Sequence, residues 1–483
     1  MSDSLGDVLS TTQHSVTING QTIAYTAVAG TLLLKEERET QDGKRANEGE
    51  KETAALFFVA YIKNDVPEDE LSGRPITFSF NGGPGSSSVW MHMGLLGPRR
   101  AQMGDAGALV GPPWHWTENE HSLLDESDLV FIDPVGTGFS RATVGEANSA
   151  FYHFRKDVAS VGDFIRLFCT RYGRWASPKY LIGESYGTTR AAALSGYLQD
   201  RHGLFLNGII FVSTILNFQT TRFAPGNDLP YALYLPSYAA AAWYHGRLET
   251  GQQQSLADTV QAARDFALGD YSAALMRGTL LSAAEEAEMA ARIGQIIGLP
   301  ADLVRRCNLR VDLTTFVNEL LREQSKVIGR LDARFTGYDL GPTGRQINLE
   351  PSSLAYNGPY TAAVYDYLRR ELKFESDLPY EIMNMRINSD WHFDEFEGSY
   401  VDVSETLRRI MVSNPHLRVL VCNGYYDMAT PFAAAEYTFN HLYLPPDLRD
   451  HVQMTYYESG HLMYVHLPSL QQQKQDLAAF LQG

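Results

Sequence analysis

Six short apolar segments recur along the chain and constrain its fold more than any other feature. They are PITFSF, DLVFID, KYLIG, GIIFVSTI, RVLVCNG and VQMTYYE, at residues 75–80, 128–133, 179–183, 208–215, 418–424 and 452–458. Short runs rich in valine, isoleucine and aromatic residues are typical of strands that are buried on both faces of a parallel sheet. Helical patterns alternate with them, for example at 154–172 and at 467–482. The alternation predicts an α/β fold with a mostly parallel central sheet.

The N-terminal region predicts an antiparallel addition to this sheet. The segments VTING and QTIAYTAV flank Asn19-Gly20, a dipeptide that favours a two-residue hairpin turn between strands. AALFFVAYIK, at residues 54–63, has the composition of a further strand. We therefore expect an antiparallel hairpin before the parallel strands begin.

Residues 217–410 break the alternation of strands and helices. Helical patterns dominate there, at 255–269, 283–298 and 312–331. We interpret this region as a large helical cap inserted into the core. The expected division is a first core segment at 1–216, the cap at 217–410 and a second core segment at 411–483.

Charge and cysteine content exclude several classes of function. The formal net charge is −17 at pH 7, and such a charge repels a phosphate backbone, so no nucleic-acid partner is expected. Cys169, Cys307 and Cys422 lie far apart, without the spacing of a metal site or a redox pair. The N-terminus lacks the basic and apolar regions of a signal peptide, and no apolar run reaches the roughly 18 residues of a membrane span. The expected location is the cytoplasm, with no membrane partner.

Ser185 lies in Gly-Glu-Ser-Tyr-Gly, at residues 183–187, between a predicted strand and an alanine-rich helical segment. The pattern G-x-S-x-G in this setting is typical of a nucleophilic serine at a sharp strand-to-helix turn, where small flanking residues leave the hydroxyl exposed above the sheet. The five residues alone also fit a serine in an ordinary turn. The flanking strand and helix favour the catalytic interpretation.

A serine hydroxyl needs a base to take its proton, and in this arrangement the orienting acid and the base follow the serine in the chain. Asp427 and His461 each come directly after a predicted strand, and we expect them to be the acid and the base. His466 is a weaker candidate for the base because it lies at the start of a helix. Asp133 precedes Ser185 and is better interpreted as a carboxylate that fixes a loop.

Acyl transfer also requires two backbone N–H donors for the oxyanion of the tetrahedral intermediate. Tyr186, directly after the serine, supplies one by its position. The other is expected from SFNGGPGSSSVW, at 79–90, because adjacent glycines after a strand let the backbone approach a substrate closely. A merely flexible turn would need only one or two such residues.

Together these motifs resemble the serine carboxypeptidase family of α/β-hydrolases, peptidase family S10. FNGGPGSSS is similar to the family's WxNGGPGCSS, LLGPRR to its ELGP segment, and DLVFIDPVGTGFS to LLFxDxPVGxGFS. GESYG, the Asp loop CNGYYDMATP and the His loop SGH complete the series in family order, from about residue 76 to 462. The resemblance implies an α/β-hydrolase fold, with a mostly parallel sheet, an N-terminal antiparallel hairpin and a helical cap insertion.

The resemblance also implies roles for two sets of residues. The first set carries out acyl transfer: the nucleophile Ser185, the acid Asp427, the base His461, and the oxyanion donors on the backbone of Gly83 and Tyr186. The second set holds the free C-terminal carboxylate of a peptide: Asn81, Gly82 and Glu184. A glutamate can donate a hydrogen bond to a carboxylate only when it is protonated. Buried donors disfavour ligands that leave them unpaired, so such a site selects chain ends.

Three residues depart from the family pattern. Ser86 replaces the cysteine that follows NGGPG, and Phe80 replaces the usual tryptophan. Ser86 and the scattered cysteines fit a bacterial-type intracellular branch. Leu95 stands where many members carry a glutamate that pairs with the equivalent of Glu184. Because that carboxyl partner is lost, a strongly acidic pH optimum does not carry over.

The leading hypothesis is a serine-type carboxypeptidase that releases C-terminal amino acids from peptides through an acyl-enzyme. An esterase or acyltransferase using the same site is one alternative, and a non-catalytic binding protein on a hydrolase scaffold is another. No cofactor or metal is expected, since acyl transfer needs none and the histidines lack HExxH spacing. The expected partner is a peptide with a free C-terminus, and a homodimer is left open.

Overall fold

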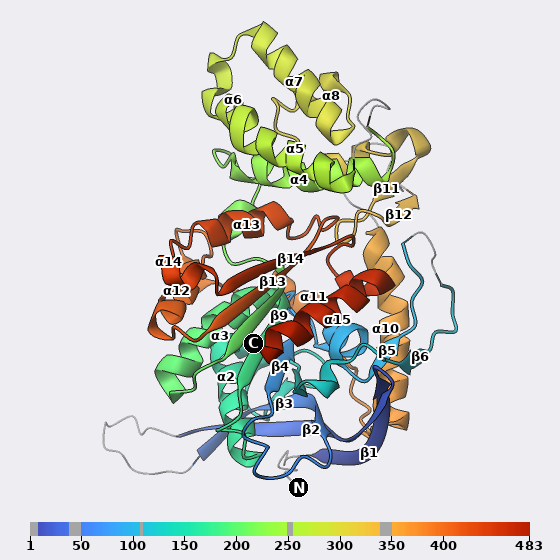
Figure 1. The fold of residues 1–483 in the computed structure, drawn as a ribbon, viewed down its shortest axis with the longest axis vertical. Helices are drawn as coiled ribbons and strands as arrows, with labels where there is room; N and C mark the ends of the chain where they lie inside the picture. Colours follow the sequence, from blue (N-terminus) through green and yellow to red (C-terminus); the bar gives the residue numbers. More distant parts are fainter. Residues whose placement is uncertain (1–7, 38–49, 107–109, 249–254, 339–349) are drawn as a thin grey trace.

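The computed structural model describes residues 8–37, 50–106, 110–248, 255–338 and 350–483. Within these ranges the central sheet has the strand order β1-β2-β3-β7-β4-β9-β10-β13-β14, and β8 pairs with β3 (Figure 1). Its strands are β1 (Leu9–Ile18), β2 (Gln21–Glu37), β3 (Glu50–Lys63), β4 (Ile76–Phe80), β7 (Asp128–Ile132), β8 (Arg141–Ala142), β9 (Lys179–Ser185), β10 (Gly208–Thr214), β13 (Arg418–Gly424) and β14 (Val452–Tyr457). Two further pairs lie outside this sheet: β5 (Arg99–Ala101) with β6 (Trp116–Glu118), and β11 (Lys326–Ile328) with β12 (Thr336–Tyr338).

The half of the sheet from β7 to β14 is parallel throughout, which confirms the predicted sheet. Its strands are the six apolar segments recognised in the sequence. Alternate residues face opposite layers, so that Ile182 of β9 lies in one buried cluster and Leu181 in another. Burial on both faces explains why the inner strands have continuous rather than alternating apolar sequences.

The predicted N-terminal hairpin is also present. β1 pairs antiparallel with β2 through a turn at Asn19 and Gly20, whose φ angles are 50° and 79°. Left-handed angles at both turn residues match the twist of the two strands, and asparagine and glycine tolerate them best. β2 continues antiparallel to β3, and β3 to β7, so this region extends one edge of the parallel sheet.

Helices cover both faces of the sheet. The α-helices of the described ranges are α1 (Val89–Met91), α2 (Phe154–Arg171), α3 (Tyr186–His202), α4 (Leu229–Tyr244), α5 (Leu256–Phe266), α6 (Ser272–Arg277), α7 (Ala283–Ile297), α8 (Ala301–Arg306), α9 (Leu313–Glu319), α10 (Pro351–Arg370), α11 (Met385–Ser389), α12 (Ser404–Ser413), α13 (Phe432–Asn440), α14 (Pro446–Arg449) and α15 (Leu467–Gln482). Phe164 of α2 and Leu194 of α3 pack in the cluster that contains Leu181. Leu477 of α15 packs in the cluster that contains Ile182, on the other face.

The region between β10 and β13 contains most of the remaining helices. Figure 1 shows α4 to α8 as a group at the top of the view, and residues from this group share a third buried cluster. α10 and α12 instead contribute to the core of the sheet, because Tyr367 lies in the cluster of Ile182 and Leu407 in that of Leu181. We keep the boundaries at 217 and 410 as a proposal for the extent of the insertion.

The expected helix at 312–331 is only partly correct. α9 ends at Glu319, and a 3-10 turn and the short strand β11 follow it. Ser325 has a left-handed φ of 55°, which ends the helical path before β11. β11 then pairs with β12, a contact that the local sequence pattern does not encode.

No helix in the described ranges is long and apolar enough to cross a lipid bilayer. Residues 1–7, which form part of the stretch considered for a signal peptide, lie outside those ranges.

Candidate active site

Ser185 is the last residue of β9, directly before α3. Its backbone angles, φ 60° and ψ −130°, are unusual for an L residue and cost about 1–3 kcal/mol. Neighbouring glycines permit the turn, because a Cβ atom on Gly183 would lie 2.2 Å from the carbonyl oxygen of Gly187. From residue 181 to 192, Ser185 is the one residue that is not buried. This geometry is typical of a nucleophilic serine presented to a substrate.

Asp427 and His461 form a buried pair. They follow β13 and its neighbour β14, so both lie at the carboxyl edge of the parallel sheet. The Nδ1 atom of His461 is 2.8 Å from Oδ2 of Asp427, and the two residues are 4% and 0% exposed. Burial lowers the pKa of His461, but the charge and hydrogen bond of Asp427 outweigh burial, so the pKa is raised above its usual 6.5.

The loop after β13 fixes the carboxylate of Asp427. Its Oδ1 atom accepts hydrogen bonds from the backbone N–H groups of Ala429 and Thr430, at 2.7 and 3.0 Å. Its Oδ2 atom accepts the hydroxyl of Thr430 at 2.7 Å. A carboxylate held in this way can keep Nδ1 of His461 protonated, which leaves Nε2 free to accept a proton.

Contacts between strand ends bring Ser185 to the same edge as the acid and base candidates. Ser185 pairs with Thr214 at the end of β10. The adjacent Ser213 donates its hydroxyl to the carbonyl oxygen of His461 at 2.7 Å. The structure therefore gathers the three residues predicted for acyl transfer at the ends of neighbouring strands.

The glycines of the NGGPG loop lie directly against the start of α3. A Cβ atom on Gly82 would be 2.5 Å from the backbone nitrogen of Tyr186, so this contact requires glycine. Gly83 has a φ of 104°, which also favours glycine. The backbone N–H of Tyr186 belongs to a helix N-terminus, where negative charge is favoured. The two predicted oxyanion donors, on Gly83 and Tyr186, thus come from segments that touch.

Glu184 is buried, and both of its carboxyl oxygens have a hydrogen-bond donor. The amide of Asn81 donates to Oε1 at 2.8 Å, and the hydroxyl of Tyr464 donates to Oε2 at 2.6 Å. Burial raises the pKa of Glu184 to about 7, against the opposing effects of the His461 charge and these two hydrogen bonds. At neutral pH this carboxyl group is protonated in a large fraction of molecules, and it can then donate a hydrogen bond to another carboxylate.

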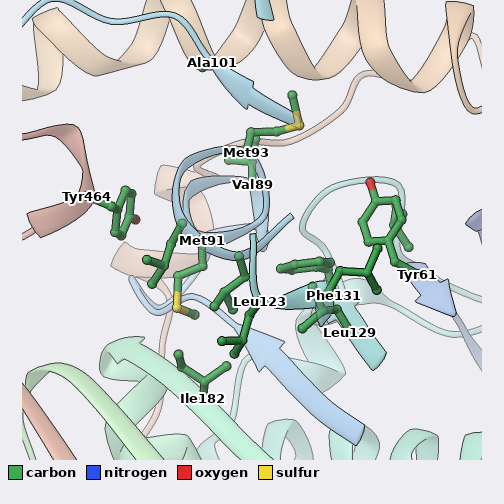
Figure 2. Close-up of a cluster of buried hydrophobic side chains, with 14 of the residues drawn as sticks. Tyr61, Val89, Met91, Met93, Ala101, Leu123, Leu129, Phe131, Ile182 and Tyr464 are labelled. Atoms are coloured by element: carbon green, nitrogen blue, oxygen red, sulfur yellow. The ribbon is translucent and has the colours of Figure 1, made fainter. Parts of the chain in front are cut away.

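Tyr464 is a site residue that the sequence reasoning missed. It lies three residues after His461 and belongs to the buried cluster drawn in Figure 2. Leu95, at the position of the family's second glutamate, is buried in the same cluster. The partner of Glu184 is therefore a phenol instead of a carboxyl group. The sequence places this tyrosine close to the candidate base but does not indicate that Glu184 is its partner.

A buried ion pair supports the site and was also missed. The Nε of Arg190 donates to Oδ2 of Asp157 at 2.7 Å, and the hydroxyl of Tyr186 donates to the same oxygen at 3.2 Å. The Nη1 of Arg190 donates to the carbonyl oxygen of Asn81 at 2.7 Å. One guanidinium thus holds the backbone of Asn81 against the helix that begins with Tyr186.

The weaker candidates from the sequence have other partners. Asp133 accepts hydrogen bonds from the backbone N–H and the hydroxyl of Ser88, at 2.8 and 2.7 Å, and so fixes a loop as expected. The Nδ1 of His466 lies 2.8 Å from the hydroxyl of Ser469 in the first turn of α15. In the described ranges no group of three or more His, Cys, Asp or Glu residues is arranged to hold a metal ion.

Residues 329–335, which join β11 to β12 and are called here the bridging segment, are hydrogen-bonded to the loops that carry Asp427 and His461. The backbone N–H of Met428 donates to the carbonyl oxygen of Arg330 at 3.0 Å. The backbone N–H of His461 donates to the carbonyl oxygen of Leu331 at 2.7 Å. The position of the candidate acid and base thus depends on residues of the bridging segment.

A family model described as serine carboxypeptidase matches residues 45–470, which is most of the chain. The chain belongs to the serine carboxypeptidase family. Serine carboxypeptidase ctsa-3.2 of Caenorhabditis elegans is 28% identical over 159 residues, 32% of this chain and 28% of that protein. Serine carboxypeptidase-like 33 of Arabidopsis thaliana is 28% identical over 163 residues, 32% of this chain and 31% of that protein. The matches span about a third or less of each relative.

A solved structure shares the fold of this serine carboxypeptidase family member. It is Kex1(delta)p, a prohormone-processing carboxypeptidase from Saccharomyces cerevisiae, and it is 14% identical to this chain with a TM-score of 0.55. The alignment covers 94% of this chain and 91% of the other. At this identity the likeness concerns the fold, and it confirms the α/β-hydrolase fold predicted from the sequence motifs.

Proposed function

We propose that this chain is a serine-type carboxypeptidase that releases C-terminal amino acids from peptides through an acyl-enzyme intermediate. The observation that carries the proposal is the buried hydrogen bond from the amide of Asn81 to Glu184. Glu184 directly precedes Ser185 and lies within electrostatic range of His461. A simple ester has no free carboxylate to which a protonated Glu184 could donate. A carboxypeptidase can use this carboxyl group to bind the free end of a chain.

We assign the terminal carboxylate of the peptide to Asn81, Gly82 and Glu184. The amide of Asn81 and the backbone N–H of Gly82 can donate to it, and protonated Glu184 adds a third donor. An amidated chain end lacks the negative charge that these donors favour. The arrangement therefore supports selection of free chain ends over internal peptide bonds.

The proposed reaction divides one difficult step into two. Ser185 attacks the carbonyl carbon of the last peptide bond while His461 takes its proton, and Asp427 stabilises the imidazolium that forms. The N–H groups of Gly83 and Tyr186 stabilise the oxyanion. His461 then returns the proton to the leaving amino group. In the second step water attacks the acyl-enzyme while His461 takes a proton from it, and His461 then returns that proton to Ser185.

A library of peptides with varied C-termini, incubated with the protein and read by mass spectrometry, tests the proposal. We expect stepwise loss of single residues from free C-termini, and no loss from the same peptides after C-terminal amidation. Equal turnover of the amidated set, or cleavage at internal bonds, would contradict the assignment. Hydrolysis of esters alone would support the esterase alternative, and failure to react with a fluorophosphonate would support the binding protein.

The rates of peptide and ester hydrolysis are expected to diverge as the pH rises above the pKa of Glu184, which is about 7. Below this pH Glu184 is protonated and donates to the substrate carboxylate, whereas above it the two carboxylates repel. The kcat/KM for peptides should then fall about tenfold for each further pH unit. An ester without a free carboxylate should keep its kcat/KM over the same range. Parallel decline of both activities would argue against this role for Glu184.

Tyr464→Phe is expected to move the fall in peptide hydrolysis to higher pH. The hydroxyl of Tyr464 stabilises ionised Glu184, so its loss raises the pKa of Glu184 further. The measurement is the pH dependence of kcat/KM for one peptide. Tyr360→Phe is the matched control, since Tyr360 is buried within electrostatic range of Glu184 but has no hydrogen bond to it in the described part of the chain. If the pH midpoint of peptide kcat/KM is the same in Tyr464→Phe as in the wild type, Tyr464 does not influence the ionisation of Glu184.

We further propose a reducing compartment such as the cytoplasm, because Cys169, Cys307 and Cys422 are free thiols. A homodimer is left open by the sequence, and sedimentation of the purified protein would measure the oligomeric state.

A further inference from the structure

A buried ion pair lies in the bridging segment, directly beside the loop that carries His461. The Nη2 of Arg334 lies 2.6 Å from Oδ2 of Asp332, and its Nε donates to Oδ1 of the same carboxylate at 3.0 Å. Both side chains are buried. The backbone N–H of Asp332 donates to the hydroxyl oxygen of Ser352, in the first turn of α10, at 3.0 Å. The pair is therefore fixed on the side away from the loop as well.

The pair makes two hydrogen bonds to the residues immediately before His461. The same Nη2 of Arg334 donates to the hydroxyl oxygen of Ser459 at 2.9 Å. The backbone N–H of Gly460 donates to Oδ2 of Asp332 at 3.1 Å. Ser459 is buried like the pair itself. One oxygen of Asp332 thus holds both the guanidinium and the loop, and both bonds end within two residues of the candidate base.

Gly460 is packed between this ion pair and the end of β13. A Cβ atom on Gly460 would lie 2.4 Å from the Cβ of Asp332, and a Cβ atom on Gly424 would lie 2.3 Å from the carbonyl oxygen of Gly460. Both positions therefore require glycine. A loop confined from two sides leaves the imidazole of His461 little freedom to move away from Asp427.

Stability alone gives no reason for charged side chains at this place. Desolvation of a buried arginine and aspartate offsets much of their attraction, and a well-packed apolar pair often stabilises a fold as well or better. Charge-assisted hydrogen bonds differ from apolar contacts because they hold their partners in one geometry. An apolar pair could not bond the hydroxyl of Ser459 or the N–H of Gly460.

We propose that Asp332 and Arg334 are positioning residues, which hold the loop before His461 so that its imidazole stays aligned with Asp427 and Ser185. They act through the backbone of the loop and not on the substrate. The inference rests on the proposed role of His461 as the base, which the carboxypeptidase and the esterase alternative share. A misplaced base slows the chemical step, so loss of the pair should lower kcat and leave KM nearly unchanged.

Arg334→Gln tests the inference, because glutamine lacks the charge and the fork of donors that joins Asp332 to Ser459. We expect kcat to fall about 10- to 100-fold for a peptide and for an ester alike, with KM within about twofold of the wild type. Arg334→Lys keeps the charge and should lose less. Ser459→Ala leaves the ion pair intact and removes only its bond to the loop, so kcat should fall about two- to tenfold.

Arg174→Gln is the matched control. Arg174 is buried, forms a salt bridge with Asp128 at the start of β7, and donates through Nε to the hydroxyl oxygen of Ser177 at 2.8 Å. It therefore repeats the set of arginine, aspartate and serine at the amino ends of the strands, away from the candidate site. Its loss should lower the thermal midpoint of unfolding and leave kcat near the wild-type value.

A kcat within about twofold of the wild type in folded Arg334→Gln would overturn the proposal. An equal loss of kcat in Arg174→Gln, or a loss confined to peptides, would also overturn it. If Arg334→Gln does not fold, an unchanged kcat in Ser459→Ala has the same meaning. A wild type that hydrolyses esters but not peptides would refute the carboxypeptidase, and the ester kcat values would still decide the role of the ion pair.

Proton NMR gives a second readout that needs no substrate. The downfield resonance of the Nδ1–H of His461 reports its hydrogen bond to Asp427, which is 2.8 Å long in the structure. This resonance should shift or broaden in Arg334→Gln and stay unchanged in Arg174→Gln. The same resonance in the wild type and in Arg334→Gln would show that the ion pair does not position the base.

Discussion

Replacing Ser185 with alanine is expected to abolish hydrolysis of both peptides and esters, with kcat falling by about 10⁴-fold or more. The change removes the oxygen that would form the acyl bond. It leaves the backbone turn at φ 60° and ψ −130° in place, because alanine is no larger than serine. Ser185 is not buried, so the free energy of unfolding should change by less than about 1 kcal/mol.

Steady-state assays, fluorophosphonate labelling and thermal unfolding of Ser185→Ala check this prediction together. The matched control is Ser195→Ala, farther along α3, which removes a hydroxyl that donates to the carbonyl oxygen of Ala192 at 2.7 Å. The control should keep its activity and its labelling. Turnover or labelling retained in Ser185→Ala would exclude Ser185 as the nucleophile.

Asp427→Asn should lower kcat by about 10⁴-fold while the protein stays folded. An amide can still accept the N–H groups of Ala429 and Thr430 through its oxygen. Its NH₂ group would then face Nδ1 of His461 in place of an acceptor. The imidazole would adopt the other tautomer, with the proton on Nε2, and could no longer accept a proton from Ser185.

The decisive measurement for Asp427→Asn is kcat for a peptide and for an ester at the same pH, with circular dichroism to check the fold. Asp402→Asn is a suitable control, because Asp402 is exposed and its Oδ1 accepts the N–H of Ser404 at 2.9 Å, a bond that asparagine can also accept. A loss below about tenfold in Asp427→Asn would show that another group orients His461.

Those parts of the fold that depend on local pattern could be predicted from the sequence. Each inner strand of the sheet is a continuous apolar run because helices cover both of its faces. Asn19 and Gly20 mark the hairpin because few residues tolerate left-handed angles. The stretch after Glu319 was misread as helix, since the left-handed Ser325 and the pairing of β11 with β12 depend on contacts from outside that segment.

The predicted site residues share a local signal, which is their place at the end of a strand. Ser185, Asp427 and His461 all follow this rule, and parallel strands bring such positions to one edge. Tyr464 and Arg190 contact the site across long sequence separations, to Glu184 and to Asn81. An aromatic residue or an arginine in an apolar stretch gives no sign of its partner, so these roles required the three-dimensional structure.

The bridging segment limits how this scaffold could be re-engineered. A chimera that exchanges the whole insertion for that of another hydrolase would also remove the acceptors for the N–H groups of Met428 and His461. Each buried donor left unpaired costs about 1–3 kcal/mol, and a displacement of the imidazole by about 1 Å would itself slow acyl transfer about 100-fold. Grafts should therefore retain residues 329–335 and vary α4 to α8, where a new specificity can be installed without loosening the base.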